Sequence, residues 1–184
     1  MELLRSLGIE VEIVPSGYAE TPIASLAPAA LAANHAREKL RAVLQRRPDA
    51  AQVPVLAADT VVDLEGRSLD KPRDAAEASE MLAALSGRDH LVHTAFALAV
   101  PDRGGCEEET ATTRVWFYPL EPAEIAAYVA TGEPFDKAGG YGIQGRAAAL
   151  VERIDGDFYT VMGLPLGRVV RTLRRLGFTL PVPK

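Results

Sequence analysis

Hydrophobic and polar positions along the first half of the chain predict helices and strands in mixed order. Residues 1–8 predict a short helix that Gly8 ends, and residues 9–15, "IEVEIVP", alternate as a half-buried strand does. From about Pro28 to Arg47, apolar residues recur at helical spacing. The apolar run in residues 53–66, "VPVLAADTVVDLEG", predicts a buried strand that ends in a turn.

The middle of the chain predicts a capped helix followed by a hairpin. Asp74 and Glu77 form a D-x-x-E capping pattern in front of a helix over residues 75–85. Residues 90–100 and 110–120 then read as two strands, joined by a turn at Gly104 and Gly105.

The last third adds two helices and one ambiguous segment. A helix over residues 123–131 follows Pro122, and a last helix over residues 166–176 follows Pro165. Residues 147–154, "AAALVERI", fit either type of element by pattern, and we interpret them as a strand. Together with the hairpin, this order favours an α/β protein with a mixed sheet and flanking helices, or an α+β protein, over a strictly alternating parallel fold.

Composition narrows the class of protein. The 184 residues carry a net charge of −5, which argues against nonspecific binding to nucleic acid but leaves room for a small phosphorylated ligand. There is no apolar run long enough to cross a membrane and no signal-peptide pattern at the N-terminus. With a single cysteine, Cys106, there is no internal disulfide framework. These features predict a cytoplasmic protein.

The stretch "GEPFDKAGGYGIQG", residues 132–145, is the most unusual part of the chain. Its last six residues fit G-x-G-x-x-G, but a predicted helix precedes them and a predicted strand follows. A dinucleotide-binding turn needs the opposite order, so that interpretation fails, and the P-loop pattern is absent. What remains is a loop whose backbone approaches a ligand closely, with a tight loop bonded only to itself as the plain alternative.

Charged residues in short motifs suggest one chemistry. Asp59 and Thr60 follow a run of apolar strand residues in "AADTVV", where a carboxylate can serve as a metal ligand, as a base, or only as a cap. Lys71 lies in "LDKP", Lys39 lies on a predicted helix, and Glu20 lies in a loop; for the last two, plain surface positions are the alternative. Acids can hold Mg²⁺ and activate water, and lysines can neutralise a polyphosphate.

Several motifs in their order along the chain resemble the Maf family, the septum-formation-inhibitor-like nucleoside triphosphate pyrophosphatases. They are "AADT", "DKP", "LSG…HLVHTAFAL", "YVATGEPFDKAGGYGIQG" and "VMGLPL", and they span nearly the whole chain. The resemblance implies a single domain over residues 1–184 with an elongated, two-lobed fold and a central cleft, similar to inosine triphosphate pyrophosphatases. It also implies Mg²⁺- or Mn²⁺-dependent hydrolysis of a nucleoside triphosphate to the monophosphate and pyrophosphate.

Particular residues match the family's functional positions. Asp59 matches the catalytic acid, read as the general base, and Glu20 and Asp136 match acids of the same cleft that we expect to bind metal together with Asp59. The phosphate-contacting lysines of the family match Lys39, Lys71 and Lys137. Thr60 and Gln144 resemble the branch that acts on dTTP and UTP, whereas the branch that acts on 7-methyl-GTP tends to carry Asp-Gln and Ser-Glu-Gly at these places.

Members of the family normally begin with a strand and a Ser-x-Ser-Pro-Arg-Arg loop that contacts phosphate and base, and this chain begins at Met1 after that point. We therefore expect that Met1 is not the natural start or that the chain is a truncated form. The alternatives are a non-catalytic regulator of septum formation, an inactive remnant, or an enzyme for noncanonical purine triphosphates. The expected partner is a small nucleoside triphosphate, with a homodimer as an open alternative to a monomer and with neither nucleic acid nor membrane.

Overall fold

The computed structural model describes residues 2–21, 23–48, 53–100 and 106–182, and its centre is one antiparallel sheet. The strands run in the order β2-β1-β3-β4-β5, and every neighbouring pair is antiparallel. Their bounds are Val55–Leu64 for β1, Arg67–Leu69 for β2, Asp89–Ala99 for β3, Cys106–Phe117 for β4 and Val151–Asp155 for β5. The prediction of an α/β protein with helices flanking a sheet is thereby confirmed, but the described sheet is antiparallel throughout and not mixed.

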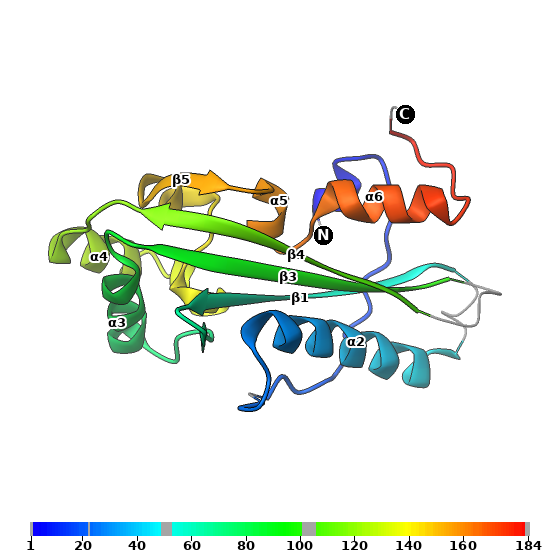
Figure 1. The fold of residues 1–184 in the computed structure, drawn as a ribbon, viewed down its shortest axis with the longest axis horizontal. Coiled ribbons are helices and arrows are strands. Elements are labelled where there is room, and N and C mark those ends of the chain that lie inside the picture. Colours follow the sequence, from blue (N-terminus) through cyan, green and yellow to red (C-terminus); the bar gives the residue numbers. More distant parts are fainter. Residues whose placement is uncertain (1, 22, 49–52, 101–105, 183–184) are drawn as a thin grey trace.

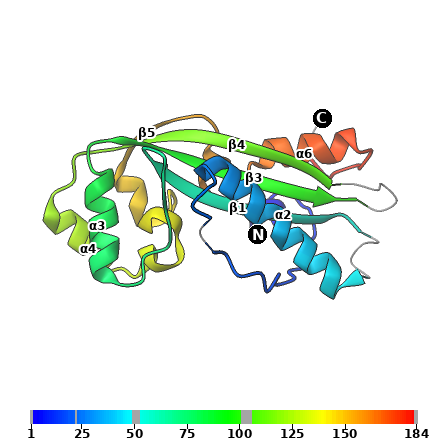
Figure 2. The same ribbon diagram turned by 60° about the horizontal axis from the view of Figure 1, so that its bottom comes forward.

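Helices cover both faces of this sheet. They are α1 (Glu2–Arg5), α2 (Pro28–Arg46), α3 (Ala75–Leu85), α4 (Pro122–Val129), α5 (Phe158–Val161) and α6 (Leu166–Arg175). Figure 1 shows an elongated molecule in which α2 and α6 lie on opposite faces at one end of the sheet. Helices α3 and α4 lie together at the other end, as the turned view in Figure 2 also shows.

Alternation along β3 explains how one strand serves both layers. Ala95 and Ala97 point to the face that α2 covers, and they pack in one buried cluster with the apolar side of that helix. Phe96 and Leu98 point to the opposite face and pack against α6. A continuous apolar strand is what burial on both faces requires, and "TAFALA" supplies it.

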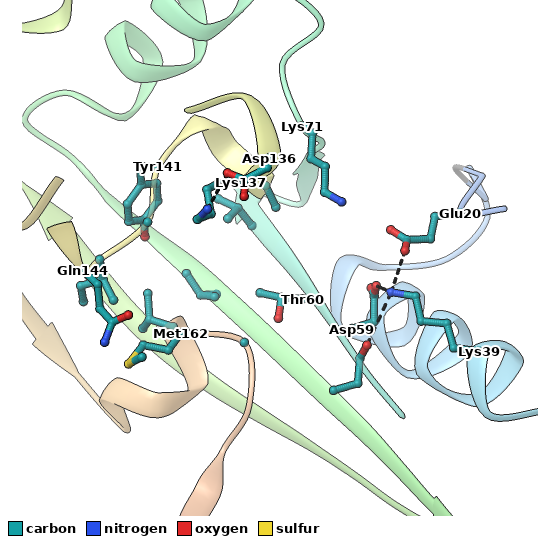
Figure 3. A pocket seen from close by; sticks show the side chains of 18 residues that line it. Glu20, Lys39, Asp59, Thr60, Lys71, Asp136, Lys137, Tyr141, Gln144 and Met162 are labelled. Atoms are coloured by element: carbon teal, nitrogen blue, oxygen red, sulfur yellow. Dashed lines mark hydrogen bonds and ion pairs between the residues drawn. The ribbon is translucent and has the colours of Figure 1, made fainter. Parts of the chain in front are cut away.

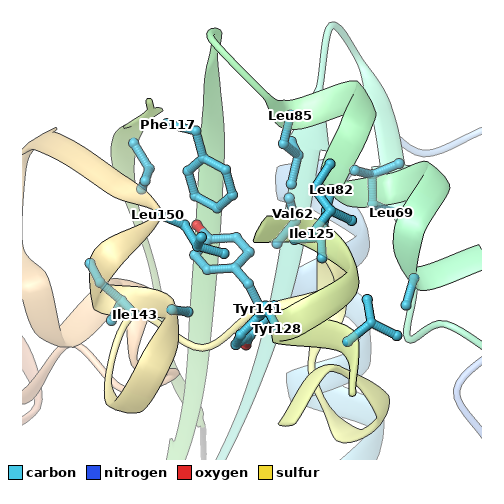
Figure 4. Packing of buried hydrophobic residues seen from close by; sticks show 14 of the residues in the cluster. Val62, Leu69, Leu82, Leu85, Phe117, Ile125, Tyr128, Tyr141, Ile143 and Leu150 are labelled. Atoms are coloured by element: carbon cyan, nitrogen blue, oxygen red, sulfur yellow. The ribbon is translucent and has the colours of Figure 1, made fainter. Parts of the chain in front are cut away.

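A third cluster fills the end of the sheet where α3 and α4 lie (Figure 4). Leu82 and Leu85 of α3 are fully buried, and Phe117 stacks edge to face on Tyr141 with ring centroids 4.8 Å apart. Helix α3 begins as its sequence predicts, because the side chain of Asp74 accepts a hydrogen bond from the backbone of Glu77 at 2.9 Å.

Some elements differ from the prediction. Residues 9–15 form no strand, because no other described strand pairs with them. In the segment 147–154, the alanines belong to a 3₁₀-helix, Gly145–Ala149, and the strand begins only at Val151. The short strand β2 and the short helix α5 were not predicted, and the predicted turn at Gly104 and Gly105 lies outside the described residues.

None of the helices in the described parts of the chain is long and apolar enough to cross a membrane.

Candidate active site

One pocket brings the predicted residues together, with a cavity volume of about 290 Å³. It lies along strand β1, between helix α2 and the glycine-rich stretch (Figure 3). The predicted site residues that line it are Glu20, Lys39, Asp59, Thr60, Lys71, Asp136, Lys137 and Gln144. All eight candidates therefore meet, although they come from five separate segments of the sequence.

Asp59 and Thr60 both reach the pocket because strand β1 has an unpaired edge at this point. Neighbouring residues of a strand point to opposite faces, so two such side chains share a pocket only where the pocket wraps around an edge. Strand β1 pairs with β3 over residues 55–63, but it pairs with β2 only over residues 62–64. Among the described residues, the second edge of β1 is therefore unpaired at Asp59, and both side chains reach the cavity.

Lys39 lies between two carboxylates. It is one helical turn after the buried His35 on α2, so its side chain points toward the sheet. Its Nζ atom lies 2.6 Å from Oδ1 of Asp59 and 2.7 Å from Oε1 of Glu20. Lys39 is thus a bridge between the loop and the strand, and the alternative of a solvated helix face does not apply to it.

The loop that carries Glu20 is anchored to α2 as well. The hydroxyl of Tyr18 lies 3.1 Å from Nδ1 of His35, and the two rings contact each other at a centroid distance of 5.7 Å. This contact fixes the loop two residues before Glu20 and directs the carboxylate toward Lys39. Tyr18 and His35 were not predicted to matter, since a single tyrosine in a loop carries no pattern.

The charges of Glu20, Lys39 and Asp59 shift one another's pKa values. Burial raises the pKa of Asp59, and the ion pair with Lys39 opposes that shift without cancelling it. Burial acts to lower the pKa of Lys39, but its bonds to Asp59 and Glu20 outweigh burial and raise it. For Glu20, burial works toward a higher pKa, yet Lys39 and Lys71 bring it below its ordinary value. Lys39 therefore stays charged, and Asp59 is a stronger base than an ordinary aspartate.

The glycine-rich stretch brings its lysine next to the "DKP" segment. The backbone N–H of Gly139 donates to the carbonyl of Asp70 at 3.1 Å, which ties residue 139 to the segment that carries Lys71. Gly139 has φ of 69°, and an added Cβ would lie 3.0 Å from Val62, so a larger residue would be strained and crowded there. This close approach explains why Lys71 and Lys137, far apart in the sequence, line the same wall of the pocket.

Two residues of the same stretch differ in their surroundings. Asp136 is 76% exposed in its side chain and pairs with Lys137 at 2.5 Å, apart from Glu20 and Asp59 in Figure 3. Tyr141 is buried in the pocket wall, where its hydroxyl lies 2.7 Å from Nε2 of the buried His90. Tyr141 belongs to the site, but sequence reasoning singled out only the charged and amide residues around it.

The carboxylates of the pocket are the residues that could bind a metal ion. In the described part of the chain, no group of three or more His, Cys, Asp or Glu side chains is arranged to hold a metal ion. Glu20 and Asp59 nevertheless converge on one point, which Lys39 occupies. Two carboxylates plus phosphate oxygens are a common way to bind Mg²⁺. A metal that arrives with a phosphorylated substrate would therefore bind the two carboxylates beside this ammonium group, and Asp136 stands apart from them.

Comparison with known proteins places the chain in a family. The model of the family described as "Maf-like protein" matches residues 1–176. The chain belongs to this family, and the resemblance inferred from its motifs is confirmed.

Similar proteins from several bacteria carry one name. A protein of Thermus thermophilus named "dTTP/UTP pyrophosphatase" is 49% identical over 177 residues, which cover 96% of this chain and 89% of the relative. A protein of Methylobacillus flagellatus with the same name is 47% identical over 184 residues, covering 98% and 89%. A third, from Moorella thermoacetica, is 49% identical over 176 residues, covering 96% and 89%.

Proposed function

We propose that this protein is an enzyme that hydrolyses dTTP and UTP to the nucleoside monophosphate and pyrophosphate. The observation that carries the proposal is the pocket in which Asp59 lies beside Lys39, with Lys71, Lys137, Thr60 and Gln144 on its other walls. The name shared by relatives at 47–49% identity over most of the chain supports the same activity.

In the proposed reaction, a water molecule attacks the α-phosphorus of the substrate. Its oxygen bonds to phosphorus, the bond between the α-phosphorus and the bridging oxygen breaks, and pyrophosphate leaves. Asp59 takes the proton of the water, for which its raised pKa suits it. Lys39 holds Oδ1 of this carboxylate, and no hydrogen bond from the described residues occupies Oδ2. Asp59 therefore keeps one oxygen available for the proton.

Negative charge increases on the leaving pyrophosphate during this step. The ammonium groups of Lys71 and Lys137 line the wall opposite Glu20 and Asp59, where they can stabilise that charge. We propose that Glu20 and Asp59 also bind a divalent cation, Mg²⁺ or Mn²⁺, which would neutralise phosphate charge when bound. Asp136 belongs to the proposed set only as a residue near the phosphates, where it positions Lys137.

The base of the nucleotide belongs at the other end of the pocket. Figure 3 shows Gln144 and Met162 on the side away from Glu20 and Lys39, with Thr60 between the two ends. Met162 lies at this end, and Ile143 and Gly163 also line the pocket; such an apolar surface suits a flat ring. We propose that the side-chain amide of Gln144 donates to the 4-keto group of uracil or thymine.

Other interpretations have less support. A non-catalytic regulator would not need a buried carboxylate paired with a lysine in a pocket. For a noncanonical purine triphosphatase, no residue that lines the pocket favours a purine base, and the names of the relatives point to pyrimidine substrates. Cytoplasmic location, the absence of nucleic-acid binding and a homodimer stay predictions.

The test is a panel of nucleoside triphosphates with pyrophosphate release as the readout, with and without Mg²⁺ or Mn²⁺. We expect dTTP and UTP to be the best substrates and the rate to depend on the added cation. Release of orthophosphate instead of pyrophosphate, or equal rates on GTP and dTTP, would contradict the proposal.

A further inference from the structure

A chain of two hydroxyl groups leads from the pocket into the protein. Oγ1 of Thr60 lies 2.8 Å from Oγ1 of Thr94, and the hydroxyl of Thr94 donates to the carbonyl oxygen of Thr160 at 2.6 Å. Thr94 is on strand β3 directly beside Thr60 of β1 in the sheet register. Thr94 and Thr160 are both fully buried, so no solvent competes for these bonds.

The chemistry of these groups fixes the direction of both hydrogen bonds. A carbonyl oxygen can only accept, so the single proton of the Thr94 hydroxyl goes to Thr160. Thr94 has no second proton to give to Thr60. The contact of 2.8 Å between the two hydroxyls is therefore a hydrogen bond only if Thr60 is the donor.

The acceptor at the end of the chain is itself held in place. Thr160 lies on the short helix α5, whose first turn is capped by Asp157. The carboxylate of Asp157 accepts from both the backbone N–H and the hydroxyl of Thr160, each at 3.0 Å. With Thr160 anchored in this way, the orientation of the Thr94 hydroxyl does not change easily, because a buried hydroxyl without its partner is costly.

From this geometry we infer that Thr94 is a positioning residue for base selection, acting through Thr60. Because the proton of Thr60 is used inside the protein, only the lone pairs of its oxygen face the pocket. Thr60 then accepts a hydrogen bond from the N3–H group of uracil or thymine, whereas N3 of cytosine carries a lone pair and is repelled. This inference rests on the proposed function, and it names the group that separates keto from amino pyrimidines.

Gln144 alone does not make this distinction. Its side chain is exposed, and no hydrogen bond to the part of the protein that the structure describes fixes its amide. A free amide can turn to donate to a 4-keto group or to accept from a 4-amino group. Thr60 differs because its polarity is set by Thr94, so the fixed hydroxyl pair must carry the discrimination.

The experiment compares UTP with CTP in the unchanged protein and in Thr94→Val, by kcat/KM. Valine has nearly the shape of threonine but can neither accept the proton of Thr60 nor donate to Thr160. The hydroxyl of Thr60 then turns freely and can donate to N3 of cytosine. We expect the ratio of UTP to CTP to fall about tenfold, as the mismatch of one hydrogen bond predicts. Thr94→Ser keeps the hydroxyl and should keep the ratio.

Thr113→Val is the matched control. Thr113 is a fully buried threonine on the neighbouring strand β4, and its hydroxyl donates to the carbonyl of Asp157 at 2.9 Å. Its loss removes a bond of the same kind next to α5 but does not touch Thr60. Thr113→Val should lower the thermal midpoint as Thr94→Val does and leave the ratio of UTP to CTP unchanged.

The outcomes separate this inference from the proposed function. Binding of the non-hydrolysable α,β-methylene analogues of UTP and CTP is measured on the same four proteins. If the unchanged protein binds both analogues but hydrolyses neither nucleotide, the proposed reaction fails, and the ratio of the two Kd values still tests Thr94. Equal ratios in Thr94→Val and the unchanged protein, or an equal fall in Thr113→Val, would overturn the role of Thr94.

Discussion

The ammonium group of Lys39 lies 2.6 Å from Oδ1 of Asp59. Both side chains are mostly shielded from solvent, with exposed fractions of 19% and 6%. A pair this buried is costly to form unless each charge is satisfied, and Glu20 supplies the second partner of Lys39. The arrangement keeps a carboxylate with a raised pKa beside a cation, which is a suitable setting for a proton acceptor in phosphate chemistry.

The first prediction concerns Asp59→Asn. An amide has nearly the same shape but cannot accept the proton of the attacking water, so we expect turnover of dTTP to fall about 10²- to 10⁴-fold. The fold should persist, as measured by circular dichroism and thermal unfolding.

Asp63→Asn serves as the matched control for this change. Asp63 lies four residues further along β1, where it contacts His93 outside the pocket. Its replacement should leave turnover close to that of the unchanged protein. Equal losses in the two variants would show that the effect comes from the strand and not from a proton acceptor in the pocket.

The second prediction concerns the lysines of the opposite wall. Lys71→Gln and Lys137→Gln each remove one positive charge, and each should lower kcat/KM for dTTP about 10- to 100-fold, the usual value of a charge-assisted hydrogen bond. Arg73→Gln is the control, because Arg73 pairs with Glu77 on the surface close to Lys71. If Arg73→Gln lowers kcat/KM as much as Lys71→Gln does, general surface charge would explain the effect instead.

The sequence predicts the residues of the candidate site more completely than it predicts the strands of the fold. The helices could be predicted from the spacing of apolar residues and from capping residues, such as Asp74 and Glu77 at the start of α3. The motifs named eight residues, and the pocket contains all of them. What the motifs could not indicate was which residues hold these eight in place, because Thr94, His35 and Tyr141 act through contacts between distant segments.

The failed predictions share a physical cause. Alternation in residues 9–15 indicates which side chains are half-buried, and the structure retains part of that pattern. A strand also needs a partner for its backbone groups, and the hydrophobic pattern of one segment carries no information about its partner. The alanines at 147–149 also fit several conformations by pattern, and in the structure they form a 3₁₀-helix that buries Ala147.

The third prediction tests how Gln144 recognises the base. In Gln144→Glu the side chain loses both amide protons and can only accept, so it no longer donates to a 4-keto group. We expect kcat/KM for dTTP and UTP to fall about tenfold, as the loss of one hydrogen bond to a buried acceptor predicts. Arg146→Gln, a change at an exposed neighbour outside the pocket lining, is the control. Unchanged values of kcat/KM in Gln144→Glu would show that the amide of Gln144 does not contact the base.

The last prediction concerns stability at acid pH and the buried His90 behind Tyr141. Burial lowers the pKa of His90 from 6.5 to about 4, and the charge of Asp89 only partly opposes this shift. Below pH 6.5 the unfolded chain binds a proton that the folded protein does not take up. Above pH 6.5 neither state binds this proton, so the folded protein keeps its full stability. As the pH falls from 6.5 to about 4, proton binding by the unfolded chain lowers the free energy of unfolding. The shift corresponds to a loss on the order of 3 kcal/mol.

The variant His90→Gln isolates this contribution. Glutamine can still form a hydrogen bond with the hydroxyl of Tyr141, but it does not titrate. Urea unfolding of both proteins at pH 7, 5.5 and 4 gives the free energy of unfolding at each pH. We expect His90→Gln to be less stable than the unchanged protein at pH 7, because it packs less well against Phe117, and to lose less stability on acidification. Equal losses between pH 7 and 4 would mean that carboxylates, and not His90, set the acid limit of the fold.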